Sequence, residues 1–348
     1  MKKNLKNVVV FIFASFLVAG VFAQQKINLK IGSVSPDNSP WAVEQKKMAQ
    51  EWAKITNGEV TITFMNATAL GGENGVIQKM KVARPGMKAP LDGGIFTNIG
   101  IYELAPESHV LTLCMPFMFK NQSEIDYVIK NTENHINKAI EDQGFYLIGW
   151  FNVGMLYFCT KEEVRTLDQL KKVSLSVGGI TSPELGKAFQ HAGYTTSDVS
   201  NEKILSSLKS STGCGGLYTI PMYAYAAQYS KYARYVLNMP ICPVMAGFVV
   251  NKQVWDSIPE KYKPALLESL RKTENVFVGV QQKNDADYLQ KIADDGGVIT
   301  NLTPSEKQAF YDSMADDALR MTNSGEVKVI NYDFFKEIEA LLKKYRGQ

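Results

Sequence analysis

Residues 260–295 contain the stretch that decides the fold, EKYKPALLESLRKTENVFVGVQQKNDADYLQKIADD. Apart from Pro264 and Gly279 it lacks the residues that interrupt helices, and Gly296-Gly297 follows it as a stop signal. A helix of about 30 residues is about 45 Å long. That length suits a helix running between two lobes better than one inside a single lobe. Two shorter helices that break near Gly279 are the alternative, and the sequence favours neither.

The rest of the chain alternates strand patterns with helix patterns. Apolar alternation or apolar runs predict strands at 27–31, 60–64, 91–96, 145–150, 155–159 and 173–177. Helix starts are predicted at Ser39-Pro40, Ser123 and Ser182-Pro183. The stripe Phe335, Ile338, Leu342 and Tyr345 predicts an amphipathic C-terminal helix. This alternation predicts an α/β fold with helices on both faces of the sheet.

The N-terminus has the pattern of a secretory signal peptide over residues 1–23. Lys2, Lys3 and Lys6 are followed by an uncharged apolar stretch, and Val21 and Ala23 occupy the two positions read by signal peptidase. The stretch is shorter than the about 20 residues of a membrane span, although an uncleaved anchor is the alternative. Gln24, and not a lipid-bearing cysteine, follows the predicted cut. We therefore expect a periplasmic protein.

The remaining length suggests two lobes, because it exceeds one comfortable hydrophobic core. We expect a boundary at residues 152–154, where a short Gly-containing turn separates two predicted strands, and a return near residues 238–243. The first lobe is predicted to comprise 24–152 and 242–275, and the second 153–241 and 276–348. The lobes should close on a ligand about these two crossings.

The net charge argues against nucleic-acid and anionic-lipid binding, and the cysteines bear on disulfide formation. The full chain has a formal net charge of +3, and losing the three N-terminal lysines leaves a neutral protein without a footprint for nucleic acid or anionic lipid. Cys114, Cys159, Cys214 and Cys242 form no C-x-x-C pair. An exported protein can oxidise them, but Cys114 and Cys159 lie in apolar strings. We therefore favour buried free thiols.

Motifs for enzyme chemistry are missing from the sequence. It has no G-x-S-x-G or H-E-x-x-H, and residues 213–216 (GCGG) resemble a phosphate loop only loosely. His109, His135 and His191 have no metal-ligand spacing, so we interpret them as structural or exposed. The acids of the long helix are interpreted as a solvated face rather than a metal site; they are Asp285, Asp287, Asp294 and Asp295. We expect neither catalysis nor a cofactor.

Short segments in a fixed order carry a family resemblance from about residue 27 to 320. They include Leu29–Ser33 with Pro36 and Ser39-Pro40-Trp41, Thr56–Val60, Leu70–Glu73, Tyr102–Pro106, Met115-Pro116-Phe117, Gly149–Asn152 with Gly154, Thr166–Lys171, Gln228-Tyr229, Tyr235-Val236, and Asn251–Pro259. In order and spacing the chain resembles the periplasmic substrate-binding proteins of TRAP transporters, the DctP-like family.

This resemblance implies a two-lobed periplasmic binding protein with a hinge and a long helix shared between lobes. It also implies ligand capture in the interlobe cleft and docking on integral-membrane permease subunits that a sodium or proton gradient drives. Such a chain is neither an enzyme nor an ATPase.

Departures from the family pattern bear on the ligand. Ser176 and Leu156 stand where the family usually has arginines that hold a ligand carboxylate, and Gly215 stands in the place of an aspartate. A carboxylate buried without a cation is costly, and arginine normally makes that burial tolerable. The departures therefore favour an apolar or neutral ligand over a small organic acid.

The candidate ligand-binding residues follow from these positions. The apolar candidates are Trp41, Phe96, Phe117, Trp150, Phe151, Leu156 and Tyr218, each of which is alternatively ordinary core. The polar and small candidates are Glu73, Asn98, Asn152, Ser176 and Gly215. By contrast, we assign Tyr223, Tyr225, Tyr229 and Tyr232 to helix packing or surface.

Two other functions remain open on the sequence. The same fold suits a periplasmic carrier that passes apolar cargo to another envelope protein, including a helical-repeat partner. An exported enzyme is the third interpretation, and the missing catalytic motifs argue against it.

Overall fold

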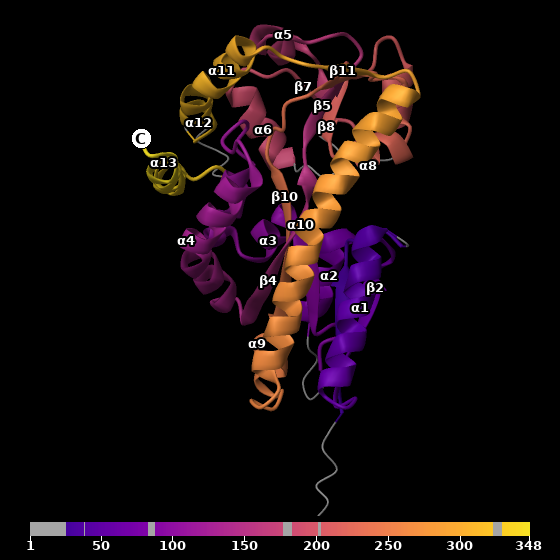
Figure 1. Ribbon diagram of the computed structural model, residues 1–348, viewed down its shortest axis with the longest axis vertical. Helices are drawn as coiled ribbons and strands as arrows, with labels where there is room; N and C mark the ends of the chain where they lie inside the picture. Colours follow the sequence, from indigo (N-terminus) through magenta and orange to yellow (C-terminus); the bar gives the residue numbers. More distant parts are fainter. Residues whose placement is uncertain (1–25, 38, 83–87, 177–182, 201–202, 323–328) are drawn as a thin grey trace, which may run out of the picture.

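Two β-sheets form the cores of two lobes, drawn one above the other in Figure 1. The computed structural model describes residues 26–37, 39–82, 88–176, 183–200, 203–322 and 329–348. Helices cover both sheets, so the predicted two-lobed α/β class is confirmed. The predicted signal peptide, Val177 and the helix start at Ser182 lie outside the described residues.

The first sheet has five strands in the order β2-β1-β3-β10-β4. Their bounds are β1 (Ile27–Ser33), β2 (Val60–Asn66), β3 (Gly93–Thr97), β4 (Phe145–Met155) and β10 (Pro243–Asn251). β1 is parallel to β2 and β3, whereas β10 is antiparallel to β3 and β4. The carboxyl ends of the three parallel strands therefore share one edge, and open α/β sheets bind ligands at such edges.

Helices on the two faces of this sheet make different contacts. The elements are α1 (Pro40–Ile55), α2 (Gly72–Lys81), α3 (Asn98–Leu104), α4 (Gln122–Glu141), α9 (Lys252–Asp256), and the 3₁₀ turns η1 (Thr68–Leu70), η2 (Pro106–Ser108) and η3 (Val110–Cys114). Gly247 of β10 faces α3, because a Cβ there would lie 3.0 Å from Ile101. Its neighbour Ala246 points to the opposite face, toward α1.

The start of α1 follows the sequence signals. Ser39 is the N-cap, and its hydroxyl accepts a hydrogen bond of 3.2 Å from the Ala42 amide. Pro40 occupies the first helical position, where its missing N–H costs nothing. Trp41 is thereby placed in the first turn of the helix, 3% exposed.

The second sheet has six strands in the order β11-β9-β5-β8-β6-β7. They are β5 (Tyr157–Thr160), β6 (Leu175–Ser176), β7 (Thr196–Ser197), β8 (Gly216–Thr219), β9 (Tyr235–Leu237) and β11 (Val298–Thr300). The accompanying helices are α5 (Leu167–Lys172), α6 (Pro183–His191), α7 (Ile204–Lys209), α8 (Pro221–Ala226), η5 (Tyr229–Lys231), α11 (Pro304–Asp312) and α12 (Met314–Thr322). A small apolar cluster around Cys159, Leu217 and Val236 covers one face of this sheet.

α10 (Lys263–Asp294) is one continuous helix of 32 residues, so the alternative of a break near Gly279 is wrong. It packs on α1 and β4 of the first lobe and on α8 and β11 of the second (Figure 1). Its buried apolar residues include Leu270, beside Gly149 of the first lobe, and Ile292, in the apolar cluster of the second lobe. The helix therefore ties the two lobes together along its length.

Strand β4 runs through the position of the predicted turn. Instead of a turn, the register with β10 shifts between Met245 opposite Asn152 and Val244 opposite Gly154, which leaves Val153 as a β-bulge. The chain passes to the second sheet only at Leu156. There the Leu156 amide donates to the Cys242 carbonyl at 3.0 Å, and the Ile241 amide donates to the Leu156 carbonyl at 2.8 Å. The outgoing and returning segments are therefore hydrogen-bonded to each other where they cross.

The C-terminal helix α13 (Tyr332–Arg346) lies beside α4. Arg346 donates to both carboxylate oxygens of Glu124 at 2.8 and 2.7 Å and to the Met118 carbonyl at 3.0 Å. Phe335, Ile338 and Leu342 are buried as the stripe predicts, whereas Tyr345 is exposed. The lobe boundaries stay a prediction; these contacts join α13 to elements within residues 24–152.

Candidate functional site

A small, partly open cavity lies between the two lobes. Its volume is about 60 Å³. Its lining residues are Val34, Ser35, Pro36, Trp41, Gln45, Ile95, Thr97, Phe151, Val153, Ile220, Tyr223, Val244, Ala246 and Phe277. Ile220 and Tyr223 come from the second lobe and Phe277 from α10, whereas the others come from the first lobe. None of the described lining residues is charged.

Gln45 and Thr97, two polar residues of the cavity wall, are held by neighbours. Gln45 accepts from the Ser33 hydroxyl at 2.8 Å and donates to the Ser35 hydroxyl at 2.7 Å. Thr97, at the carboxyl end of β3, donates its hydroxyl to Glu73 at 2.8 Å and its amide to the same carboxylate at 2.5 Å. These bonds fix the walls where β1 and β3 end.

Glu73, predicted as a ligand contact, lies one residue behind the cavity. Burial raises the pKa of its carboxyl to about 7, and the hydrogen bonds from Thr97 only partly oppose this. Gly100 allows the close packing, because a Cβ there would lie 2.5 Å from the Glu73 carboxylate. The structure thus gives Glu73 the position of a group that orients Thr97.

Trp41 and Phe151 are the predicted candidates that line the cavity. Val34, Gln45, Thr97 and Phe277 are wall residues that sequence reasoning missed. Phe277 carried a usable signal, since it is an aromatic residue within a largely polar helix. Tyr223, assigned to packing or surface, packs against the core as expected and also lines the cavity.

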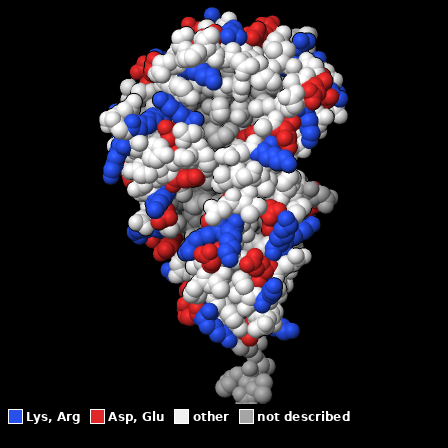
Figure 2. All heavy atoms as spheres, in the orientation of Figure 1, with Lys and Arg blue, Asp and Glu red and all other residues white. Residues whose placement is uncertain are grey.

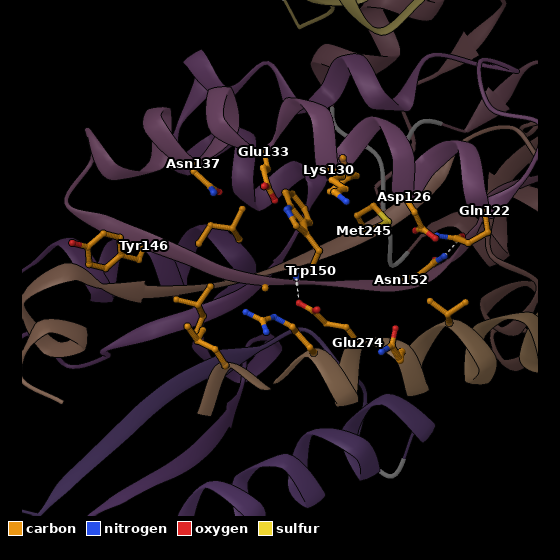
Figure 3. A pocket seen from close by; sticks show the side chains of 18 of the residues that line it. Gln122, Asp126, Lys130, Glu133, Asn137, Tyr146, Trp150, Asn152, Met245 and Glu274 are labelled. Atoms are coloured by element: carbon orange, nitrogen blue, oxygen red, sulfur yellow. Dashed lines mark hydrogen bonds between the residues drawn. The ribbon is translucent and has the colours of Figure 1, made fainter. Parts of the chain in front are cut away.

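Trp150 and Asn152 flank Phe151 on β4 and therefore point to the opposite face of the sheet. There they line a groove of about 550 Å³ between α4, β4 and α10 (Figure 3). Asn152 donates to Gln122, and the Trp150 amide donates to Glu274 at 2.8 Å. The structure thus divides three consecutive candidates between two sites.

Other candidates are buried outside both hollows. Asn98 accepts a hydrogen bond from the Met245 amide at 2.8 Å, and Phe96 packs beside Gly94 and Gly100. Phe117 contacts Phe158 and Phe310 with ring centroids 6.3 and 5.2 Å away, at the junction of the lobes.

The remaining candidates lie at the crossing and in the second lobe. Leu156 is the crossing residue itself. Tyr218 stacks on Phe189 at 5.2 Å inside the second lobe. Ser176 is fully buried in β6. The Gly215 amide donates a hydrogen bond of 2.8 Å to the Ser174 carbonyl. Their assignment as ligand contacts stays a prediction.

One further interpretation needs correction. Asp285 is not on a solvated face: it is 8% exposed and accepts from the Met155 amide at 3.2 Å. His109 and His135 are structural, as interpreted from the sequence: their rings stack at 5.3 Å beside Phe334. The error for Asp285 arises because tertiary packing brings it to Met155, 130 positions earlier in the chain.

The four cysteines are free and buried, as predicted. Within the described residues, no group of three or more potential ligands is placed to hold a metal ion. No helix in that part of the chain is long and apolar enough to cross a membrane. Figure 2 shows acidic and basic side chains intermixed over the face it presents.

Comparison with solved structures places this fold beside periplasmic solute-binding proteins of TRAP transporters. One from Ralstonia eutropha, with bound (S)-2-acetolactate, has a TM-score of 0.73 at 20% identity over 91% of this chain and 99% of that one. One from Sulfurospirillum deleyianum, with bound succinate, has a TM-score of 0.72 at 16% identity over 91% and 99%. One from Ochrobactrum anthropi, whose C-terminus is bound in its ligand pocket, has a TM-score of 0.76 at 16% identity over 93% and 97%.

No curated protein matches the sequence. The family called bacterial extracellular solute-binding protein, family 7 (DctP), matches residues 31–324, which is most of the chain. The protein therefore belongs to family 7 of the bacterial extracellular solute-binding proteins, and it has the two-lobed fold of their TRAP periplasmic members.

Proposed function

We propose that this protein is an exported receptor that captures a small, neutral, largely apolar ligand between its lobes. It then delivers the ligand to the membrane permease of a TRAP-type, ion-driven importer. The observation that carries the ligand class is the uncharged wall of the interlobe cavity. A carboxylate enclosed there has no described lysine or arginine to neutralise it, and unpaired buried charge is strongly unfavourable.

The proposed ligand differs from those of the structural relatives. Succinate and (S)-2-acetolactate, the molecules bound in two of them, are acids. In this chain the aromatic and aliphatic walls favour removal of apolar surface from water. Phe151, Phe277 and Ile220 are among the residues that form those walls.

Closure about the crossings at Leu156 and residues 238–242 would bring Ile220 and Tyr223 onto the first lobe. Since the cavity is built from both lobes, a ligand bound there stabilises the closed arrangement. Such a closed form is what a permease can distinguish from the empty receptor. This function requires no catalytic turnover.

The test begins with the ligand itself. The protein is purified from the periplasm under native conditions, and the molecule released on unfolding is identified by mass spectrometry. Its affinity is then measured by calorimetry, beside that of succinate. N-terminal sequencing of the same sample checks cleavage after Ala23.

Two substitutions at one wall position separate cavity binding from adventitious binding. Ala246 lies in β10, 2% exposed, and lines the cavity. Ala246→Leu fills the space and should weaken binding at least tenfold, whereas Ala246→Gly widens it and should retain binding; circular dichroism verifies folding of both. Micromolar succinate binding that Ala246→Leu abolishes would overturn the neutral ligand class but keep the receptor role.

A further inference from the structure

Trp41 combines a side chain that lines the interlobe cavity with a buried hydrogen-bond donor that has no partner among the described residues. Its side chain is 3% exposed and lines the cavity, and its indole Nε1 has no hydrogen-bond partner among the described residues. Buried polar groups are nearly always paired. Of the described lining residues, Trp41 has the buried side-chain polar atom that still needs a partner.

The neighbouring polar groups do not supply this partner. Gln45 is engaged with Ser33 and Ser35, and its amide nitrogen is used in the second of these bonds. The Thr97 hydroxyl donates to Glu73 and accepts from the Ile99 amide. The apolar cavity wall and the unpaired Trp41 indole N–H therefore suit a ligand that carries a hydrogen-bond acceptor.

Trp52 shows that an unpaired indole is not in itself a ligand site. Its Nε1 also lacks a partner among the described residues, but the ring is fully buried and packs on Phe248 and Trp255 at 6.2 and 6.1 Å. It lines none of the described cavities. Trp41 differs because it lines the cavity between the two lobes.

The position of Trp41 in α1 adds a second preference for an acceptor oxygen. The helix has 16 residues, and Trp41 lies in its first turn after Ser39 and Pro40. The N-terminus of a helix carries partial positive charge, which favours a partially negative atom nearby. The absence of a charged group in the described wall argues against a full negative charge.

We infer that the ligand places a neutral carbonyl oxygen on the Trp41 indole N–H, with its apolar part against Phe151 and Phe277. The ligand class is then a small carbonyl compound, such as a ketone or ester, rather than a hydrocarbon or a carboxylate. This rests on the proposed function, since it deepens the chemistry of the same cavity. The cavity of about 60 Å³ compares with roughly 10–15 Å³ for one water molecule, so compounds of about six heavy atoms are suitable probes.

Two probes of matched shape test the inference. Cyclopentanone has the carbonyl oxygen, whereas methylenecyclopentane replaces it by a carbon of the same geometry. The ¹⁵N-labelled mature protein is titrated with each, and indole N–H resonances are followed by NMR; the spectrum of Trp41→Phe assigns the Trp41 signal. We expect cyclopentanone to move this signal downfield and to bind about tenfold more tightly.

Matched variants complete the experiment. Trp41→Phe keeps an aromatic ring without the donor, and should bring the affinities of the two probes within twofold. Trp52→Phe makes the same chemical change in the core and should leave the tenfold preference intact. If Trp41→Phe does not fold, Trp→Phe variants at the other three tryptophans assign the Trp41 signal by elimination. The shift of that signal in the wild type then tests the inference.

The outcomes separate the two proposals. Equal binding of both probes by the wild type, or a preference that survives Trp41→Phe, overturns the role of Trp41 but leaves a receptor for neutral ligands. Saturation by succinate with no response to either probe overturns the neutral ligand class. No response of cavity resonances to any of the three compounds overturns both.

Discussion

Asp285 of α10 accepts a hydrogen bond of 3.2 Å from the amide of Met155, the last residue of β4. Glu274, 11 positions earlier on the helix, accepts one of 2.8 Å from the amide of Trp150, five positions earlier on the strand. Eleven residues of helix and five of strand both span about 16 Å. The spacing of the two carboxylates on α10 therefore matches the spacing of the two amides on β4. β4 is an edge strand of the first sheet, paired with β10 on one side only. α10 protects this edge in place of a sixth strand.

The Asp285 contact predicts a pH dependence of folding stability. Burial raises the pKa of Asp285 to about 6, against the opposing hydrogen bonds from Met155 and Gln281. A carboxyl with a raised folded-state pKa contributes stability at low pH that is lost as the pH rises through 6. Between pH 7 and 5 the wild type should gain about 1 kcal/mol relative to Asp285→Asn, measured by urea unfolding.

Asp287→Asn is the matched control, because Asp287 lies on the exposed face of the same helix. It should follow the wild type at both pH values. A stability difference between wild type and Asp285→Asn that stays constant from pH 7 to 5 would contradict this prediction.

Two glycines near this helix predict opposite effects. Gly279 is exposed within α10, and an added Cβ meets no atom within 4 Å. Gly279→Ala should therefore stabilise the protein by about 1 kcal/mol, the difference in helix propensity. At Gly149 a Cβ would lie 2.4 Å from Glu274 and 2.8 Å from Leu270. Gly149→Ala should cost about 1–3 kcal/mol, because the carboxylate must leave the Trp150 amide.

Urea unfolding of both variants at one pH measures these changes. Similar changes in the free energy of unfolding for Gly279→Ala and Gly149→Ala would contradict the predicted opposite effects.

Local signals predicted the fold well, and tertiary contacts explain what they missed. Ser39 and Pro40 started α1 as expected, and the composition of residues 260–295 indicated the long helix. Gly279 left its continuity open, since glycine in a helix is unfavourable but tolerated. The predicted turn at 152–154 is a bulge at Val153, which depends on pairing with β10, about 90 residues away.

The site was harder to predict because it depends on which face of each strand is turned inward. Sequence reasoning grouped Trp150, Phe151 and Asn152, although adjacent strand residues point to opposite faces. The bulge also changes that alternation locally. Thr97, Tyr223 and Phe277 meet only when both lobes and α10 are in place.

The contact between His109 and α13 predicts loss of stability in mild acid. Asn331 caps α13 by accepting the Phe334 amide at 2.9 Å, and its Nδ2 lies 3.3 Å from Nε2 of His109. Protonation of His109 removes that acceptor and puts positive charge beside a helix N-terminus. Burial, and then the neighbouring His135, lower the pKa of His109, while Glu107 opposes them.

A lowered folded-state pKa means that the stabilising contribution is present above the unfolded value, near 6.5, and is lost as the pH falls. From pH 7.5 to 5.5 the wild type should therefore lose more stability than His109→Asn, in which asparagine suits the positive φ of 52°. His191→Gln, a change at an exposed histidine, should behave like the wild type. Thermal melting at several pH values measures the difference. Parallel curves for wild type and His109→Asn would contradict the assignment.

Position 176 offers the sharpest contrast between the family resemblance and the structure. The resemblance gives Ser176 the place of a ligand-binding arginine, so Ser176→Arg should create carboxylate binding if the side chain opens into the cleft. In the structure Ser176 is fully buried and lies in β6, which is paired with β7 on one side and β8 on the other. An arginine there buries a cation, which costs about 3–5 kcal/mol when it has no partner.

We therefore expect Ser176→Arg to lower the free energy of unfolding by at least about 3 kcal/mol, and not to bind succinate. Ser206→Arg, which adds the same side chain at an exposed serine of α7, should unfold like the wild type. Urea unfolding followed by tryptophan fluorescence measures stability, and calorimetry measures succinate binding. A Ser176→Arg protein with wild-type stability and measurable succinate affinity would show that this position faces the ligand. In that case the substitution restores the arginine clamp, and Ser176 sets the preference for neutral ligands because it is too short to supply a charge.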